Sequence, residues 1–414
     1  MKFGKSRAAR AAGFAVAAVT ALALSGCAGG AGGDGGDGGD GENAEPYRVL
    51  VLGGISAEGA LGNNASTSVQ SAEASAAVLN EAGGILGREI EVTVVDDQAD
   101  PTVAVTLVRE AINSDTPPDA ILNSGPSTVA DATLPIISQA GILSFNIGPT
   151  SGSADPAQFP LNFDLSVSAA DQIRGVSAYF KEQGYESVGI LHGSSSYGEL
   201  YGKMSDEVFA ADGFTIVGNE EYDVAALDMT PQLEKLKAED PDVLMLDAYG
   251  APLGYVLQGM EKLAWDVPIA GNTSVAATGL VSTEPPSGVL GTDQVKNLVM
   301  QVYNSTVHQD DATLVNEAVD AMLELGPIKA TLILAYNYDA LRLIKAAAEH
   351  LDSADDAAAI AKAIEDPKVT DVADTAILGH YVFSSTSHAP DAGAEEFAMV
   401  VPSPVIDGQY HPQN

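Results

Sequence analysis

AILNSGPSTVADATLPIISQAGILSFNIGPT, residues 120–150, is the stretch of sequence that decides the fold. Its apolar start at 120–122 predicts a buried strand, and a polar loop then leads into a helix expected over 129–139. A second strand is expected at 142–145, before the loop Gly148-Pro149-Thr150. Two strands joined by one helix are the repeating unit of a parallel sheet, so the chain is expected to be an α/β protein.

The same alternation extends in both directions along the chain. Strands are expected at 48–52, 89–95, 187–191, 215–217, 243–246 and 269–270, and helices at 67–81, 102–113, 169–183, 198–211, 229–237 and 253–263. We therefore predict two doubly wound, Rossmann-like lobes with parallel sheets, joined by a hinge of crossing strands. The crossings are expected near 162–165, 291–303 and 378–383. One lobe would then hold 47–163 and about 303–378, and the other 164–302 and about 379–414.

The first 27 residues have the layout of a secretory signal. A basic start precedes an apolar run at 11–24, which is shorter than a membrane-spanning helix. The run ends at Leu24-Ser25-Gly26-Cys27, and small residues before a cysteine resemble the lipobox of bacterial lipoproteins. The resemblance implies that Cys27, the only cysteine, is lipidated and anchors the protein to the membrane from outside the cytoplasm. An ordinary signal peptide with an incidental cysteine stays open as the alternative.

Residues 28–46 are expected to form a disordered tether between this anchor and a folded body. They are almost entirely Gly, Asp and Ala and contain no apolar period that could stabilise a fold. The body is expected to begin near Tyr47.

Composition restricts the function classes. The chain has 57 Asp and Glu residues against 19 Lys and Arg residues, a formal net charge of −38. Phosphate backbones repel such a chain, so nucleic acid is not an expected partner. The acidity is interpreted as a solvated surface rather than as a cation sponge. The sequence lacks the motifs of nucleophilic, zinc and phosphate-binding enzymes, so we expect no enzyme activity, no catalytic residue, no cofactor and no metal.

Several motifs follow one another along the body. They are Asn80-Glu81-Ala82-Gly83-Gly84-Ile85-Leu86-Gly87-Arg88, Asp96-Asp97-Gln98-Ala99-Asp100-Pro101, Gly141-Ile142-Leu143, Tyr197-Gly198-Glu199, Ala335-Tyr336-Asn337-Tyr338-Asp339-Ala340, and Phe383 with His388. Together they resemble the type I periplasmic binding proteins, and among these the leucine/isoleucine/valine-binding proteins of ABC importers. From the residues themselves, the glycines are expected to allow left-handed backbone in a helix-to-strand turn, and Asp100 to cap a helix that starts at Pro101.

The resemblance implies a ligand site at the carboxyl ends of the strands. In the family, the serine matching Ser127 receives the ligand carboxylate, and the residues matching Gly148 and Thr150 hold both ends of an amino acid's backbone. Thr128 and Pro149 are included among the predicted contacts. From the residues alone, Ser127 capping its own helix stays open as the alternative.

The second lobe is expected to contribute two tyrosines. Tyr197 and Tyr249 each follow a strand, and the matching family tyrosines close over the ligand with ring packing and a hydroxyl. Packing of either tyrosine on its own lobe is the alternative. Leu61 stands where the family places a residue against the ligand side chain, and a small aliphatic residue leaves more room there than an aromatic one.

One position departs from the family. Members that hold an α-amino acid use a glutamate for the ammonium after the strand near residue 270, and this chain has Thr273 there. An ammonium without a charged partner in a closed cleft is costly. Either another acid replaces the glutamate, with Asp247 as a candidate, or the ligand lacks an amine.

The predicted function is that of an extracytoplasmic solute-binding lipoprotein, anchored by lipid to the cell membrane. It would capture a small molecule by hinge closure and deliver it to an ABC transporter permease. An amino acid, a branched-chain one first, is the expected ligand. The alternative is a sensor for a non-amino-acid carboxylate or amide that signals to a membrane receptor, and neighbouring permease and ATPase genes would separate the two functions.

Overall fold

The computed structural model describes residues 45–411, and the structural statements below concern this part of the chain. The predicted leader, Cys27 and the predicted tether up to residue 44 lie outside the described residues. The chain divides into the units Met1–Glu42 and Asn43–Asn414, and the second unit contains the body. The first strand begins at Tyr47, where the sequence predicts the body to begin.

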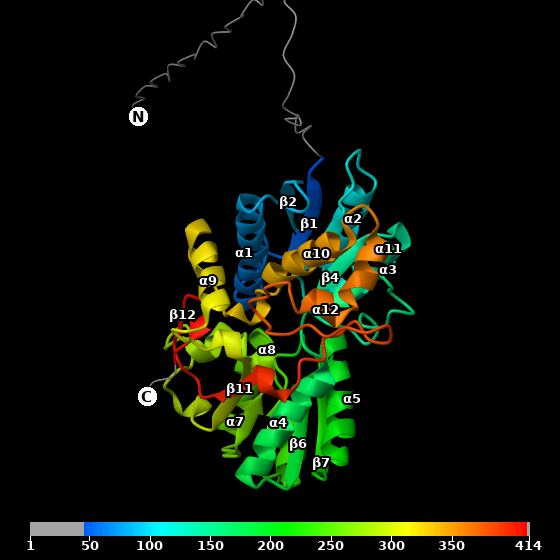
Figure 1. The fold of residues 1–414 in the computed structure, drawn as a ribbon. Coiled ribbons are helices and arrows are strands. Elements are labelled where there is room, and N and C mark those ends of the chain that lie inside the picture. Colours follow the sequence, from blue (N-terminus) through cyan, green and yellow to red (C-terminus); the bar gives the residue numbers. More distant parts are fainter. Residues whose placement is uncertain (1–44, 412–414) are drawn as a thin grey trace, which may run out of the picture. The chain divides into compact units, whose positions relative to one another are not determined.

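The first sheet has five parallel strands in the order β2-β1-β3-β4-β5 (Figure 1). The strands are β1 (Tyr47–Gly53), β2 (Ile90–Asp96), β3 (Ala120–Asn123), β4 (Leu143–Asn146) and β5 (Asn162–Asp164). Successive side chains of β1 point to opposite faces, so Val49 and Val51 join one buried cluster while Leu50 and Leu52 join another. Burial on both faces explains why this strand has a continuous apolar sequence.

Helices cover both faces of the five-stranded sheet. On one side lie α1 (Ala60–Glu81), α9 (Thr313–Leu325), α10 (Asn337–Leu351), α11 (Ala357–Ile364) and α12 (Pro367–Thr370), and on the other α2 (Pro101–Ile112) and α3 (Ser127–Ala140). Val69 and Ala72 of α1 belong to the cluster of Val49, whereas Val108 of α2 and Ile137 of α3 belong to that of Leu50. This two-sided cover is the doubly wound arrangement that the sequence predicts.

The second sheet has six strands in the order β11-β10-β9-β8-β6-β7, and only β11 runs antiparallel to its neighbour. The strands are β6 (Ser187–Gly193), β7 (Thr215–Tyr222), β8 (Val243–Leu246), β9 (Ile269–Gly271), β10 (Leu298–Tyr303) and β11 (Phe397–Val400). A separate hairpin joins β12 (Val405–Ile406) to β13 (Gln409–Tyr410). Parallel strands therefore dominate both large sheets, as the sequence predicts.

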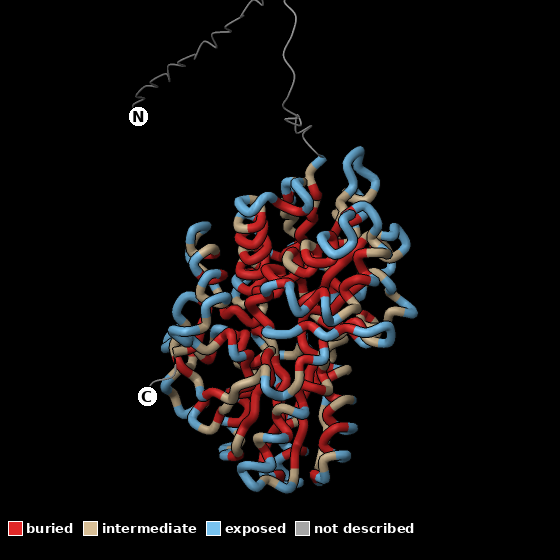
Figure 2. Tube along the Cα trace, viewed as in Figure 1, coloured by how far each residue is buried: buried red, intermediate tan, exposed pale blue. Residues whose placement is uncertain are grey.

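The six-stranded sheet is also covered on both faces. The helices are α4 (Ala169–Gln183), α5 (Ser196–Ala211), α6 (Thr230–Ala238), α7 (Ala251–Lys262) and the short α8 (Thr273–Ala276). Phe180 of α4 and Phe209 of α5 stack with ring centroids 5.4 Å apart and share a cluster with Val188 and Met245. Leu233 of α6 and Leu257 of α7 belong to the other cluster, so the sheet separates two layers of helices. Figure 2 shows that buried residues concentrate in the sheets and on the helix sides that face them.

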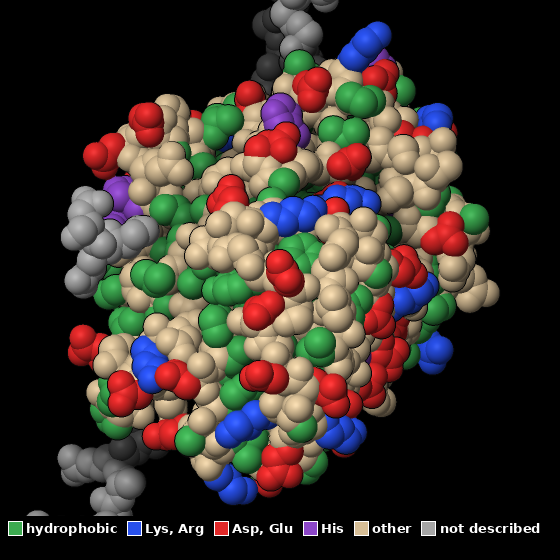
Figure 3. All heavy atoms as spheres, turned by 90° about the horizontal axis from the view of Figure 1, so that it is seen from below, with side chains coloured by type: hydrophobic (Ala, Val, Ile, Leu, Met, Phe, Trp, Pro, Cys, Tyr) green, Lys and Arg blue, Asp and Glu red, His purple; other side chains and the backbone are tan. Residues whose placement is uncertain are grey.

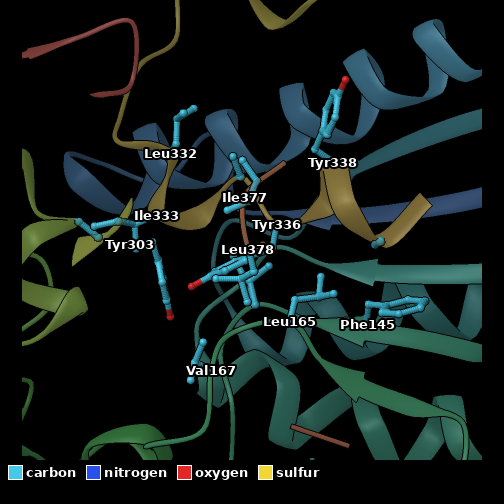
Figure 4. Close-up of a cluster of buried hydrophobic side chains, with 14 of the residues drawn as sticks. Phe145, Leu165, Val167, Tyr303, Leu332, Ile333, Tyr336, Tyr338, Ile377 and Leu378 are labelled. Atoms are coloured by element: carbon cyan, nitrogen blue, oxygen red, sulfur yellow. The ribbon is translucent and has the colours of Figure 1, made fainter. Parts of the chain in front are cut away.

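The chain passes from one sheet to the other in three places within the described residues. It leaves β5 for α4, leaves β10 for α9, and leaves α12 for β11. Buried side chains from these connections pack together, including Leu165, Val167, Tyr303 and Leu378 (Figure 4). The lobe boundaries that we expect from the sequence stay a proposal.

Local signals in the sequence explain several turns. Gly84 has a φ of +70°, and a Cβ atom there would lie 1.9 Å from the Arg88 carbonyl oxygen, so only glycine fits this turn. The Asp100 side chain accepts from the Thr102 N–H at 2.7 Å and caps α2, which starts at Pro101. Both features confirm the sequence predictions for the helix-to-strand turn and the helix start.

Helix α1 begins earlier than expected, at Ala60 instead of residue 67. Its first turns bury Gly62, Asn64, Thr67 and Ser68, which are small or polar. Such residues give no apolar period, so the sequence pattern does not reveal that these turns are helical and packed.

The surface is acidic, as the composition predicts. Figure 3 shows Asp and Glu side chains spread over the face in view, with fewer Lys and Arg side chains among them. Among residues 45–411, no helix has the length and apolar character needed to cross a membrane. The same residues contain no group of His, Cys, Asp and Glu side chains that could hold a metal ion.

Candidate functional site

A cavity of about 280 Å³ lies where the carboxyl ends of strands from both sheets converge. The loops after β1, β3 and β4 line it from one side, and the loops after β6, β8 and β9 line it from the other. Open α/β sheets bind ligands at this edge, because the strand ends present polar loops and helix starts there. The volume is just below the usual range for drug-sized ligands, about 300–1,000 Å³, and suits a small solute.

All but one of the sequence-predicted site residues line this cavity. They are Leu61, Ser127, Thr128, Gly148 and Pro149 from the side of the five-stranded sheet, and Tyr197, Tyr249 and Thr273 from the side of the six-stranded sheet. The structure therefore brings together residues that are more than 200 positions apart in the sequence. Their roles in ligand binding stay predictions.

Thr150 is the exception, because it is not among the lining residues. It is buried, and its hydroxyl oxygen accepts from the backbone N–H of Ser153 at 3.1 Å and of Gly152 at 3.3 Å. Its own N–H donates to the Ser153 hydroxyl at 2.8 Å. These bonds hold the loop after β4 in a tight turn, and the Ser153 hydroxyl in turn donates to buried Asp164 at 2.7 Å.

The start of α3 presents hydrogen-bond donors to the cavity. The Ser127 hydroxyl oxygen accepts from the Tyr197 N–H at 3.2 Å, which leaves the hydroxyl hydrogen free to donate. Among the described residues, no side chain caps α3, and no acceptor pairs with the N–H of Ser127 or Thr128. Ser127 therefore does not cap its own helix. Free N–H groups and the helix dipole both favour an anion at this end of the cavity.

Gly148 lies close to these donors. A Cβ atom at this position would lie 2.8 Å from the Ser127 nitrogen and 3.1 Å from the Gly125 carbonyl oxygen. A side chain would therefore push the loop after β4 away from the start of α3. Glycine therefore allows the two loops to meet.

The opposite wall carries oxygen atoms from the six-stranded side. The Tyr197 hydroxyl donates to the Gln172 Oε1 at 3.2 Å, and the Thr273 hydroxyl donates to the same oxygen at 3.0 Å. The Tyr197 ring packs on Tyr201 with centroids 5.8 Å apart. Burial raises the pKa of Tyr197 well above its ordinary value, and the nearby Asp247 carboxylate raises it further, so the hydroxyl keeps its proton.

Asp247 is the one charged side chain among the described residues that line the cavity. It follows β8, is only 4% exposed, and its Oδ1 accepts from the Asn272 amide at 2.8 Å. Burial raises the pKa of Asp247, and the bond from Asn272 opposes that rise. Interaction with the nearby His192 also opposes the rise in pKa. Burial of a carboxylate is costly, so a ligand that brings a positive group would stabilise it further.

An apolar wall completes the cavity. Leu61 of α1 lines it together with Ile333, Leu334 and Tyr336, which precede α10. Figure 4 shows Ile333 and Tyr336 within the cluster of buried side chains. Ile333 and Tyr336 are each 1% exposed, so their positions are fixed by the core. This wall suits an aliphatic group rather than a second charge.

Hydrogen bonds across the cavity join its two sides. Besides the bond between Tyr197 and Ser127, the Asn64 amide of α1 donates to the Tyr249 hydroxyl at 2.9 Å and to the Ala277 carbonyl at 3.1 Å. The Ser196 hydroxyl also donates to the Asp131 carboxylate. The structure therefore has the two sides in direct contact around the cavity.

Comparison with known proteins identifies the family. A family model described as periplasmic binding protein matches residues 46–395, which is most of the chain. The chain belongs to the periplasmic binding protein family. Among curated relatives, it is 25% identical over 296 residues to the Leu/Ile/Val-binding protein BraC3 of Rhizobium johnstonii, covering 70% of this chain and 76% of that relative.

Solved structures show the same fold. A type 1 periplasmic binding protein from Bordetella pertussis superposes with a TM-score of 0.72 at 20% identity, covering 86% of this chain and 96% of the other. An ABC transporter substrate-binding protein from Desulfitobacterium hafniense gives 0.65 at 19% identity, over 86% and 97%. This periplasmic binding protein therefore has the type I fold expected from its sequence. The family consists of binding proteins, and small-solute binding is the role it supports here.

Sequence reasoning missed two residues of the site. Gln172 lies inside α4 on its buried side, and Asn64 lies in the early turns of α1. Neither follows a strand, and neither belongs to a charged or aromatic motif. A polar residue on the apolar face of an amphipathic helix is the one signal that could have indicated Gln172.

Proposed function

We propose that the protein captures a small zwitterionic solute outside the cytoplasm and delivers it to an ABC importer. The observation that carries the proposal is the polarity of the cavity, with donors at the start of α3 on one side and Asp247 on the other. An α-amino acid has a carboxylate for the first and an ammonium for the second.

An aliphatic amino acid is the ligand that best matches the remaining wall. Leu61, Ile333 and Leu334 offer an apolar surface without a charged side chain. The relative from Rhizobium carries a name that states binding of leucine, isoleucine and valine, which supports a branched-chain solute for this chain also.

Capture would work by hinge closure. The proposed lobes are 47–163 with about 303–378, and 164–302 with about 379–414, and their connections pass beside the buried residues of Figure 4. A solute that contacts both sides favours the closed form, because it binds that form more tightly than the open one. The bond between the Tyr197 N–H and Ser127 belongs to the closed form in this proposal.

The location and the anchor extend the proposal. Membership of the family supports an extracytoplasmic site of action, and the lipobox-like residues before Cys27 support attachment to the membrane by lipid. The partner would be the permease of an ABC importer, and the similarity to an ABC transporter substrate-binding protein from Desulfitobacterium supports this.

A thermal-shift screen of the purified protein tests the binding role. It covers the amino acids, the matching deaminated acids, amides and polyamines, and calorimetry follows each hit. We expect aliphatic amino acids to raise the unfolding midpoint and to bind with one solute per chain. Tyr179, which lies on α4 and is absent from the cavity lining, supplies the control variant Tyr179→Ala, which should bind as wild type does. A screen in which no solute binds would contradict the proposal.

Uptake by cells tests delivery. Deletion of the gene should abolish uptake of the radiolabelled hit at low concentration, and neighbouring permease and ATPase genes should be required for the same uptake. Uptake that is unchanged by the deletion would favour the sensor function instead.

A further inference from the structure

Gln172 lines the cavity beside two hydroxyl groups and contacts both. It belongs to α4, and it is 1% exposed. Its Oε1 receives the Tyr197 hydroxyl at 3.2 Å and the Thr273 hydroxyl at 3.0 Å. These three side chains come from three separate elements, and the glutamine is the member that joins the other two.

The orientation of the Gln172 amide is determined by its other neighbours. Its Nε2 donates to the Val167 carbonyl oxygen at 2.8 Å. Turning the amide over would place Oε1 against that carbonyl oxygen, so a hydrogen bond would be replaced by a repulsion between two acceptors. The backbone of Gln172 is held as well, because its carbonyl accepts from the Gln301 amide at 2.8 Å. Oε1 therefore faces the two hydroxyls.

This orientation fixes the direction of both hydroxyl hydrogen bonds. A hydroxyl has one hydrogen, and an amide oxygen can only accept, so Tyr197 and Thr273 both use their hydrogens on Gln172. What remains toward the cavity are oxygen lone pairs. Asp247, whose carboxylate also lines the cavity, adds a further acceptor. Tyr249 differs, because it accepts from Asn64 and keeps its own hydrogen free.

We propose that Gln172 is a positioning residue that sets the specificity of the cleft, by holding Tyr197 and Thr273 as acceptors so that the solute must offer a donor such as an ammonium group. The inference rests on the proposed function and adds to it the residue that makes the cleft prefer a solute with an ammonium group. It also gives the proposed answer to the question raised by Thr273. The threonine takes part through its lone pairs, and Asp247 supplies the negative charge that a glutamate would have supplied.

The first test reads the hydroxyl itself and needs no solute. The intensity ratio of the Raman doublet of tyrosine differs between a hydroxyl that donates a hydrogen bond and one that accepts. Subtracting the spectrum of Tyr197→Phe isolates the doublet of Tyr197. In wild type we expect a donating hydroxyl. Gln172→Met should remove that signature. Gln172→Glu should keep it, because a protonated, buried carboxyl group donates to the Val167 carbonyl as the amide does and still accepts from Tyr197. A doublet that is the same in wild type and Gln172→Met would overturn the proposal.

The second test measures selectivity. Calorimetry compares L-leucine with 4-methylpentanoate, which lacks the amine. Wild type should prefer L-leucine by about tenfold or more, the scale of a hydrogen bond to a charged group. Gln172→Met frees both hydroxyl hydrogens to donate to a carboxylate, so the preference should fall about fivefold or more. Gln172→Glu should retain the preference of wild type.

Gln301→Met is the matched control. Gln301 is also a buried glutamine and contacts the Gln172 backbone, but it is absent from the cavity lining. We expect this variant to keep both the doublet and the preference for leucine. A preference that is equal in wild type, Gln172→Met and Gln301→Met would overturn the proposal. Failure of every solute to bind wild type would contradict the proposed function, while the Raman experiment would still decide the role of Gln172.

Discussion

Replacing Asn64 with alanine tests whether the contacts across the cavity stabilise a closed form. The Asn64 amide joins α1 to the opposite wall through the Tyr249 hydroxyl at 2.9 Å and the Ala277 carbonyl at 3.1 Å. Each such bond contributes about 0.5–1.5 kcal/mol net, so their loss should cost about 2 kcal/mol. In an open form water solvates these groups, so the cost falls on closure alone. Affinity for the tightest solute of the screen should then drop about 30-fold.

Calorimetry and stopped-flow fluorescence measure the effect. We expect a higher dissociation rate and an association rate close to that of wild type, because the bonds form only after the solute has entered. Asn63→Ala is the control, since Asn63 is the exposed neighbour on the same helix. An affinity of Asn64→Ala within twofold of wild type, or an equal loss in Asn63→Ala, would refute the reasoning.

Three further changes have expected outcomes. Tyr197→Ala should weaken solute binding by about 1–3 kcal/mol while the protein stays folded, since it removes a ring and a hydroxyl from the cavity wall. An unchanged Kd by calorimetry would contradict this. Burial raises the pKa of Asp164 to about 7, above its value in the unfolded chain. The folded protein therefore holds this proton more tightly than the unfolded chain does. The stabilisation from this proton is complete below about pH 4 and is lost as pH rises toward 7. Urea unfolding should therefore show a weaker fall of stability with pH in Asp164→Asn than in wild type, and equal slopes would count against this. Cys27→Ser should move the protein from washed membranes to the soluble fraction on an immunoblot, and its retention in membranes at wild-type levels would remove the lipid-anchor hypothesis.

Much of the fold could be predicted because its signals are local. Strands buried on both faces are apolar throughout, as in β1, and helix starts carry caps such as Asp100. The pattern is weaker where burial involves small or polar side chains, which is why the first turns of α1 were missed. β5 has only three residues and lies in an irregular stretch, so its pairing with β4 depends on tertiary contacts that no sequence period expresses.

The candidate site could be predicted as far as topology determines it. The carboxyl ends of parallel strands meet at one edge, so residues such as Ser127 and Tyr249 were expected to lie close together. Gln172 lines the cavity from a helix, and Asn64 of another helix bonds to the lining residue Tyr249. Their roles depend on bonding partners more than 100 positions away in the sequence, which no local pattern reveals. Thr150 was expected at the site because its loop follows β4. Its hydroxyl instead accepts hydrogen bonds from the backbone of its own turn, and the sequence does not show this.

The charge of the chain and the polarity of the cavity both disfavour an anionic solute that lacks a positive group. With 57 acidic against 19 basic residues, the protein repels an anion as it approaches, and salt screens this effect over about 8 Å at physiological ionic strength. Inside, an anion without a positive group would leave buried Asp247 unpaired, and salt does not reach that carboxylate. A zwitterion avoids both costs, because it has no net charge and, in the proposed binding mode, its ammonium would face Asp247. A preference for the amino acid over its deaminated form that persists at high salt therefore comes from the cavity and not from the surface.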